Sequence, residues 1–313
     1  MPSTQTSKPA AASKPPAPRF TRLALGLALL ACGAAWGLTI PLTKLAVSSG
    51  HQPLGLVFWQ LIFSSIALTG ICLLRRLWFP LTRQVLGYVV VIALLGTIVP
   101  NSFSYLAAAQ LPAGIMAIVM ASAPMFALVV ANGLRIEPFS WLRSTGVAVG
   151  AVAVLVLLVP QASLPDAGQR VFVLVALLAP LCYGVEVSYI AKRAPPTVDA
   201  AAALLGASVT GAFIAAPLAL ASGTWVDMWV PWQTAEWALL LSSLCHTAAY
   251  TGYIWLVGIA GPIFTSQSAY VITLFGVLLS ALILNESYSS WVWLSLLLML
   301  LGLALVQPRN SSP

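Results

Sequence analysis

Two side chains that can gain or lose a proton lie inside long apolar runs of this chain. Glu186 lies in the run from Val171 to Ala191, and His246 lies near the middle of the run from Trp237 to Val257. An ionised group inside a bilayer costs about 2.5–3.5 kcal/mol on insertion scales, so such residues usually face a wet cavity or a transport pathway. Either residue could bind a polar solute or exchange a proton. Glu186 and His246 are therefore the candidates for proton coupling.

Each of these residues also has a structural interpretation. Glu186 could reach the membrane surface and pair with Lys192 or Arg193, which follow it within two helical turns. His246 could remain neutral and hydrogen-bond to a neighbouring helix.

Neutral polar and aromatic side chains accompany these two residues on the apolar runs. Amides and hydroxyls can hydrogen-bond a polar solute without the cost of a charge, and aromatic rings give it apolar walls. The same residue types also form hydrogen bonds between helices. The candidate substrate-binding set is Trp36, Thr39, Gln60, Asn101, Tyr105, Tyr183, Glu186, His246, Tyr250, Gln267 and Tyr270.

Ten apolar stretches qualify as the elements that position these side chains, because a membrane-spanning helix needs about 20 mostly apolar residues. The first five are Leu23–Leu42, Gly55–Leu74, Val85–Ala108, Ala113–Leu134 and Ser144–Val159. The second five are Val171–Ala191, Ala200–Leu220, Trp237–Val257, Pro262–Leu284 and Trp291–Val306. The predicted fold class is an all-α membrane protein.

The composition excludes several other classes of protein. Of 313 residues, 60% are hydrophobic and 7% are charged, whereas a soluble domain carries about 25% charged residues. The net charge of +7 comes from basic residues that stand singly or in pairs between apolar runs, so we expect no nucleic-acid partner. The four cysteines show no CxxC spacing and there are two histidines, so we expect no metal, disulfide framework or cofactor. We find no Walker A or GxSxG motif, and we predict that the protein is not an enzyme.

The positions of the basic residues predict the orientation in the membrane. With the N-terminal tail in the cytoplasm, ten crossings place most Lys and Arg residues on the cytoplasmic side, and only Lys44 and Arg170 outside. Both termini are then cytoplasmic. We expect the protein to lie in the inner (plasma) membrane of a bacterium and to cross it many times. We divide the chain into a disordered tail over 1–22 and two five-helix units over 23–160 and 171–307.

An odd number of helices in each unit requires the second unit to be inserted upside down. Internal similarities support such a repeat: Trp36-Gly37 corresponds to Tyr183-Gly184, and Glu137 corresponds to Glu286. We therefore predict two inverted five-helix repeats, an arrangement that favours alternating access around a site near the middle of the membrane.

These motifs resemble a known family. Trp36-Gly37, Lys44, Pro124, Glu137 and the Gly146/Gly150 pair look like one EamA-type repeat of the drug/metabolite transporter superfamily, and the second half looks like another. The resemblance implies ten helices around a central cavity, both termini in the cytoplasm, and in many members export of amino acids, related metabolites or drugs. Lys44, Glu137 and Glu286 lie at helix ends, where we expect them to anchor loops.

The resulting hypothesis is a secondary transporter that exports a small metabolite through the lipid bilayer, driven by a proton gradient or by diffusion. The alternatives are a flippase for a lipid-linked small molecule, an integral-membrane enzyme, or a non-transporting subunit. Gly146-xxx-Gly150 allows close helix packing, either within the repeat or in a homodimer.

Overall fold

The computed structural model describes residues 21–78, 80–158 and 168–307, and its regular elements are all helices. The predicted tail over 1–22 therefore lies almost wholly outside the described residues. The helices of the first half are α1 (Arg22–Ala46), α2 (Pro53–Arg75), α3 (Arg83–Ala93), the π-helix η1 (Leu94–Ile98), α4 (Val99–Gln110), α5 (Ala113–Met120), α6 (Ala123–Gly133) and α7 (Trp141–Leu158). Those of the second half are α8 (Gln169–Arg193), α9 (Ala200–Ala221), α10 (Thr234–Ala260), α11 (Pro262–Ser266), α12 (Ser268–Leu284) and α13 (Ser290–Val306).

These helices combine into ten membrane-crossing units among the described residues, as the sequence predicts. Eight units are long and apolar enough to span a membrane by length and composition alone. The ninth, α10, has 27 residues and does not meet that measure; it carries His246, Thr247 and two serines, Ser242 and Ser243. The tenth, α13, is apolar with 17 residues. The hydroxyl groups of α10, on Ser242, Ser243 and Thr247, are buried in the bundle, whereas apolar side chains such as Leu241 and Leu244 are exposed.

Three of the ten units are interrupted, and a proline stands close to the first two interruptions. Pro100 has no N–H to donate to the carbonyl of Gly96, so α-helical bonding is lost at that point and the π-helix η1 separates α3 from α4. Pro124 follows the break between α5 and α6. The unit that begins at Pro262 breaks at Gln267, between α11 and α12. The sequence-based spans did not include these breaks.

The two halves pack in a repeated pattern. α1 packs against α10 and α12, and its counterpart α8 packs against α4 and α6. At two close approaches that correspond by the repeat, Gly37 of α1 faces Phe275 of α12, and Gly184 of α8 faces Phe126 of α6. A Cβ atom on Gly37 would stand 2.8 Å from the Phe275 Cβ, and one on Gly184 would stand 3.0 Å from the Phe126 Cβ. Glycine is needed at both places because the backbone and Cβ atoms of the facing helix leave no room for a side chain.

The remaining helices pair across the two halves, α2 with α9 and α7 with α13. In the second pair, Gly146 lies against Gly302, where an added Cβ would stand 2.7 Å from the Gly302 carbonyl oxygen. A Cβ on Gly150 would overlap Met125 of α6. The Gly146-xxx-Gly150 motif is thus used inside the chain, partly between the repeats, and is not free to form a dimer face.

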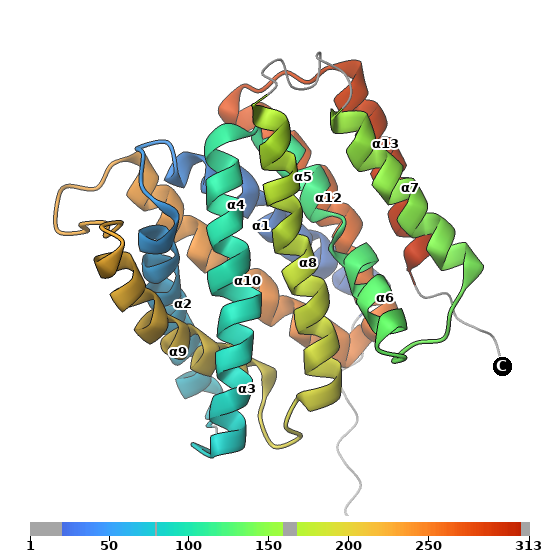
Figure 1. Cartoon of the computed structure of the whole chain (residues 1–313). Helices are drawn as coiled ribbons and strands as arrows, with labels where there is room; N and C mark the ends of the chain where they lie inside the picture. Colours follow the sequence, from blue (N-terminus) through green and yellow to red (C-terminus); the bar gives the residue numbers. More distant parts are fainter. Residues whose placement is uncertain (1–20, 79, 159–167, 308–313) are drawn as a thin grey trace, which may run out of the picture.

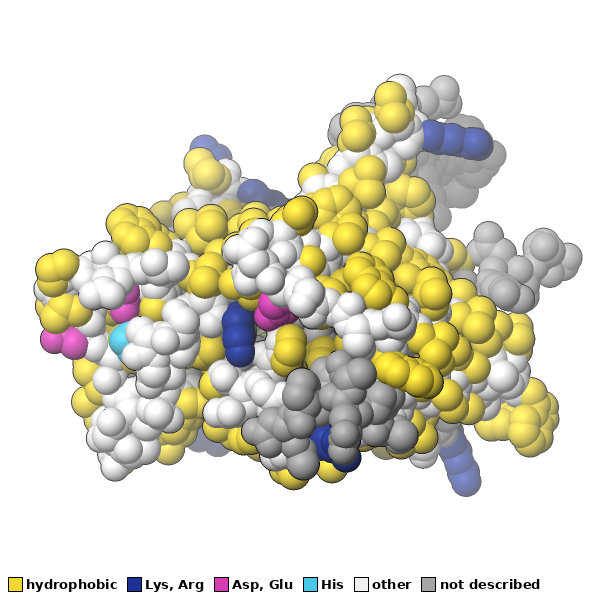
Figure 2. All heavy atoms as spheres, turned by 90° about the horizontal axis from the view of Figure 1, so that it is seen from above, with side chains coloured by type: hydrophobic (Ala, Val, Ile, Leu, Met, Phe, Trp, Pro, Cys, Tyr) yellow, Lys and Arg dark blue, Asp and Glu magenta, His cyan; other side chains and the backbone are white. Residues whose placement is uncertain are grey.

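The bundle has two distinct ends. We call the end where α1 begins and α13 ends the terminal end, and the opposite end, which carries Lys44, His51 and Glu286, the distal end. In Figure 1 the terminal end is at the bottom, where α8 also finishes, and the distal end is at the top. Figure 2 looks onto the distal end: hydrophobic and uncharged groups dominate it, and one basic and one acidic side chain lie side by side near its middle.

Candidate functional site

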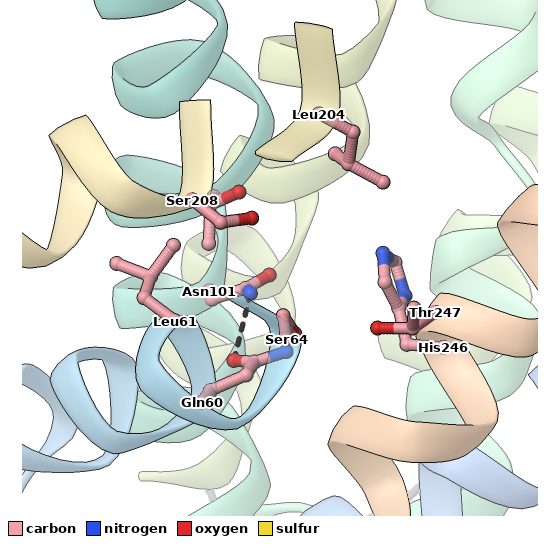
Figure 3. A pocket seen from close by; sticks show the side chains of 9 residues that line it. Gln60, Leu61, Ser64, Asn101, Leu204, Ser208, His246 and Thr247 are labelled. Atoms are coloured by element: carbon pink, nitrogen blue, oxygen red, sulfur yellow. Dashed lines mark hydrogen bonds between the residues drawn. The ribbon is translucent and has the colours of Figure 1, made fainter. Parts of the chain in front are cut away.

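A chain of hydrogen bonds links the first half to the second in the middle of the bundle. The Tyr183 hydroxyl on α8 donates to Asn101 Oδ1 on α4 at 2.9 Å. The Asn101 amide donates in turn to Gln60 Oε1 on α2 at 2.9 Å, and the Tyr105 hydroxyl donates to the same oxygen at 2.9 Å. Figure 3 shows the Asn101–Gln60 bond beside the side chains that surround it. Four residues predicted for the site are therefore in one network.

An aromatic group lies on the α1–α10 interface. The Trp36 indole N–H donates to His246 Nδ1 at 3.1 Å. The Trp36 ring also lies 6.1 Å from the Tyr250 ring and 5.9 Å from the Tyr253 ring, edge to face. An indole N–H can only donate, so His246 Nδ1 accepts and the neutral ring carries its proton on Nε2. Protonation of His246 on Nδ1 requires this bond to break.

Glu186 lies on α8 opposite the π-helix η1. Its carboxylate occupies the space that a Cβ atom on Gly96 would need. The phenol groups of Tyr88, Tyr183 and Tyr250 lie within its electrostatic reach. Among the described residues Glu186 takes part in no ion pair and no side-chain hydrogen bond; Lys192 instead donates to the Leu134 carbonyl at 3.3 Å. The predicted alternative of pairing with Lys192 or Arg193 is not seen. π-helical turns occur frequently at functional sites.

A small polar cavity adjoins the hydrogen-bond network. Its volume of about 10 Å³ is near the minimum that one water molecule requires. The lining residues come from α2, η1, α4, α9 and α10, so both halves contribute to it. They are Gln60, Leu61, Ser64, Thr97, Asn101, Leu204, Ser208, His246 and Thr247 (Figure 3).

Two charged residues hydrogen-bond to the helix ends that meet at the distal end. Lys44 Nζ donates to the carbonyls of Ala108 and Leu111 at 2.7 and 2.9 Å, where α4 finishes. The Glu286 carboxylate accepts from the Ala113 N–H at 2.8 Å, where α5 begins. It also accepts from the Gly114 N–H and the Tyr288 hydroxyl. A surface hollow of about 390 Å³ lies between Lys44 and Glu286. Both residues thus anchor the α4–α5 connection.

The repeat-related residues make different contacts at the terminal end. The symmetric counterpart of the α4–α5 connection is the α10–α11 connection at Gly261. Lys192 and Glu137 correspond by the repeat to Lys44 and Glu286, but they make other contacts. Lys192 donates to the Leu134 carbonyl just after α6, and Glu137 forms an ion pair with Arg143. α5 packs firmly on α12, whereas among the described residues α6 and α11, their counterparts, make at most marginal contact. The bundle is therefore fastened more tightly at the distal end.

The remaining predicted residues are Thr39, Gln267 and Tyr270. The Thr39 hydroxyl donates to the Trp36 carbonyl of its own helix at 2.6 Å. Gln267 donates to Gln307 at the terminal end and is not brought to the central network. Tyr270 is partly buried on α12. The sequence did not single out the hydroxyls that line the cavity, since serine and threonine in helices commonly bond to their own backbone.

Ten crossing helices, repeated halves and a polar centre shared by both halves define a transporter of the multi-pass membrane type. The chain belongs to the EamA-like transporter family, which matches residues 23–159 and again 170–307. It is therefore a membrane transporter with a small-molecule substrate, and not an enzyme. This membership confirms the resemblance to the drug/metabolite transporter superfamily.

The fold is similar to that of a solved structure described as "Crystal structure of protein". The two agree with a TM-score of 0.60 at 16% sequence identity, over 91% of this chain and 96% of that chain. At this identity the likeness concerns the fold alone. None of the curated proteins compared with the chain matches it.

Proposed function

We propose that this transporter exports a small metabolite, such as an amino acid, an amino acid derivative or a drug-like solute, across the inner membrane by alternating access. The observation that carries the proposal is the unpaired Glu186 carboxylate in the middle of the bundle, beside the network that joins the two halves. A polar centre of this kind is costly in a membrane unless it binds something.

The proposed substrate site lies between α1, α2, α4, α8 and α10. Trp36, Tyr250 and Tyr183 supply aromatic walls, and Gln60, Asn101 and His246 supply hydrogen-bonding groups. Glu186 supplies the charge, for a substrate ammonium group or for a proton. Thr39, Gln267 and Tyr270 remain proposed site residues that would join the site in another state of the transport cycle.

The unequal ends of the bundle support alternating access. In an inverted-repeat transporter, the contacts that close one end have symmetric counterparts that close the other end. Here Lys44 and Glu286 hold the distal end, while Lys192 and Glu137 do not make the matching contacts at the terminal end. We assign this structure to a state closed at the distal end. We expect the closing contacts to break there and to form at the terminal end during transport.

The distribution of basic residues supports an orientation with the terminal end in the cytoplasm. Arg75, Arg76, Arg135 and the pair Lys192-Arg193 lie at or near helix ends on that side. Both chain termini would then be cytoplasmic, and Lys44 and Glu286 would close the outer end. Export would start from the cytoplasm-facing end.

The proposal is tested in two stages. Untargeted metabolite profiling of cells with and without the gene should show one class of small solute that accumulates inside cells lacking the transporter. Purified protein in liposomes should then move that solute, and empty liposomes should not. Unchanged profiles together with accumulation of a lipid-linked compound would contradict export of a soluble metabolite and favour a flippase.

A further inference from the structure

The amide and imidazole acceptor atoms around the central cavity are occupied inside the protein. Gln60 Oε1 accepts two hydrogen bonds, from Asn101 and Tyr105. Asn101 Oδ1 accepts the Tyr183 hydroxyl, and His246 Nδ1 accepts the Trp36 indole. No free carboxylate, amide oxygen or imine nitrogen therefore remains among the residues that line this cavity.

Several donors at the same cavity lack partners among the described residues. The Gln60 amide nitrogen carries two N–H groups, and His246 carries one on Nε2 because Nδ1 is an acceptor. Neither nitrogen takes part in a hydrogen bond within the described chain. Thr247 gives the clearest case: it is 2% exposed, it lines the cavity, and its hydroxyl oxygen has no partner there. Figure 3 shows Gln60, Ser208, His246 and Thr247 around the same space.

A buried donor without a partner is unfavourable, so such groups are normally satisfied by a ligand or by water. Donors without free strong acceptors suit an oxygen atom that accepts several hydrogen bonds. They suit a metal cation or an ammonium group less well, because only the lining hydroxyl oxygens are left to accept or to coordinate. The volume of about 10 Å³ holds one such atom.

We infer that this cavity is a subsite for one acceptor oxygen of the substrate, from a carboxylate or from a neutral carbonyl, held by Thr247, Gln60 and His246. The inference rests on the proposed function, since it names the chemical class that the transporter takes. In the absence of substrate, a single water occupies the place of the oxygen. Glu186 lies outside this cavity and remains available for an ammonium group of the substrate or for the coupling proton.

The test uses matched compounds that differ in one oxygen-bearing group. Affinities of the purified full-length protein are measured for leucine, leucinamide and 3-methylbutylamine, and for phenylalanine, phenylalaninamide and 2-phenylethylamine. The compounds with a carboxylate or carbonyl should bind at least about tenfold more tightly than the matching amine. A difference between acid and amide tells which of the two oxygens the subsite prefers.

Thr247→Val keeps the side-chain shape and removes the donor. It should weaken the oxygen-bearing compounds roughly two- to tenfold, the range expected for one hydrogen bond, and leave the amines unchanged. Thr251→Val is the matched control on the same helix, because the Thr251 hydroxyl donates to the Thr247 carbonyl and does not line the cavity. Equal affinities for acids and amines, or an equal loss for both classes in Thr247→Val, would overturn the inference.

If no compound in either series binds, that result counts against an amino-acid-like substrate. The subsite itself is then tested by a measurement without any ligand. A high-resolution experimental structure should show one ordered solvent oxygen within about 3.2 Å of Thr247 Oγ1. This density should disappear in Thr247→Val. An empty cavity in the wild type, or a metal cation in it, would overturn the subsite while leaving transport itself intact.

Discussion

Gly96 and Glu186 occupy complementary space on opposite sides of the interface between the two halves. The carboxylate of Glu186 lies where any side chain at position 96 would begin. Gly96 also lies inside the π-helical turn, whose wider backbone faces α8. The glycine, the π-helix and the acid thus form one local arrangement, which Pro100 initiates by removing a hydrogen bond.

Gly96→Ala should displace the Glu186 carboxylate and reduce transport at least about tenfold. A Cβ atom at this position would collide with the Glu186 carboxylate. We expect the carboxylate to move before the fold is destabilised. Transport into liposomes and the melting temperature are measured together. Gly87→Ala is the control, since a Cβ on Gly87 of the same crossing unit meets no atom within 4 Å. Normal transport in Gly96→Ala would contradict the arrangement.

Lys44→Met and Glu286→Gln should each loosen the distal end. Each change removes charge-assisted hydrogen bonds to the α4–α5 connection, which are stronger than neutral ones. A reporter cysteine, Ala117→Cys, is placed on α5 against α12 in a background that lacks the four native cysteines. Its labelling by a membrane-impermeant maleimide should accelerate roughly tenfold in either variant. Lys192→Met is the control; equal labelling in all variants would show that Lys44 and Glu286 do not hold this end closed.

Glu236 lies in the first turn of α10, just outside the apolar run Trp237–Val257, and we expect it to make stability pH-dependent. Burial by itself raises the pKa of this carboxyl. Hydrogen bonds from His51 and from the backbone N–H groups of Gln233 and Glu236 outweigh burial and bring the pKa below its ordinary value of 4.5. Nε2 of His51 lies 2.6 Å from Glu236 Oε1. A lowered pKa in the folded state contributes stability above about pH 4.5, and this stability is lost as the pH falls through the folded-state pKa.

The melting temperature of the wild type should therefore decline below pH 4.5 more steeply than that of Glu236→Gln. The variant cannot take up a proton at this position as the pH falls, so its own decline reports the other groups. The readout is the difference between the two slopes from pH 3 to 6, an interval that brackets the ordinary value of about 4.5. Parallel slopes would mean that the His51–Glu236 pair gives no net stabilisation.

Reporter fusions test the proposed orientation. Fusions after Arg76, after Arg135 and at the C-terminus should report the cytoplasm, whereas fusions near His51 and Asp227 should report the outside. This pattern follows from ten crossings with basic residues retained in the cytoplasm. A C-terminus on the outside would overturn the orientation and the direction of the proposed export.

The sequence predicts the ten crossings because hydropathy in a membrane protein reports length and burial directly. Every predicted span overlaps a crossing unit of the structure. The interruptions were missed, since apolar runs such as Val85–Ala108 remain apolar through η1. Pro100 and Gly96 were visible in the sequence, but a proline within a membrane helix does not by itself fix a π-helical turn.

The candidate site was only partly predictable. Glu186 and His246 stand out because ionisable groups are rare in apolar runs. Thr247 and Ser208 did not stand out, since a hydroxyl on a helix usually bonds one turn back along its own backbone. Only the three-dimensional arrangement shows that the Thr247 hydroxyl is buried without such a partner. Gln267 was selected as a polar residue in an apolar span; in this structure it lies near the terminal end and donates to Gln307.

Glu186→Gln in proteoliposomes with an imposed pH difference tests the central claim most directly. If Glu186 carries the coupling proton, the variant should lose gradient-driven transport and retain substrate exchange, because glutamine resembles the protonated acid. If Glu186 only contacts the substrate, both activities should fall together. Wild-type activity of Glu186→Gln in both assays across a pH series would contradict the claim that this carboxylate takes part in transport.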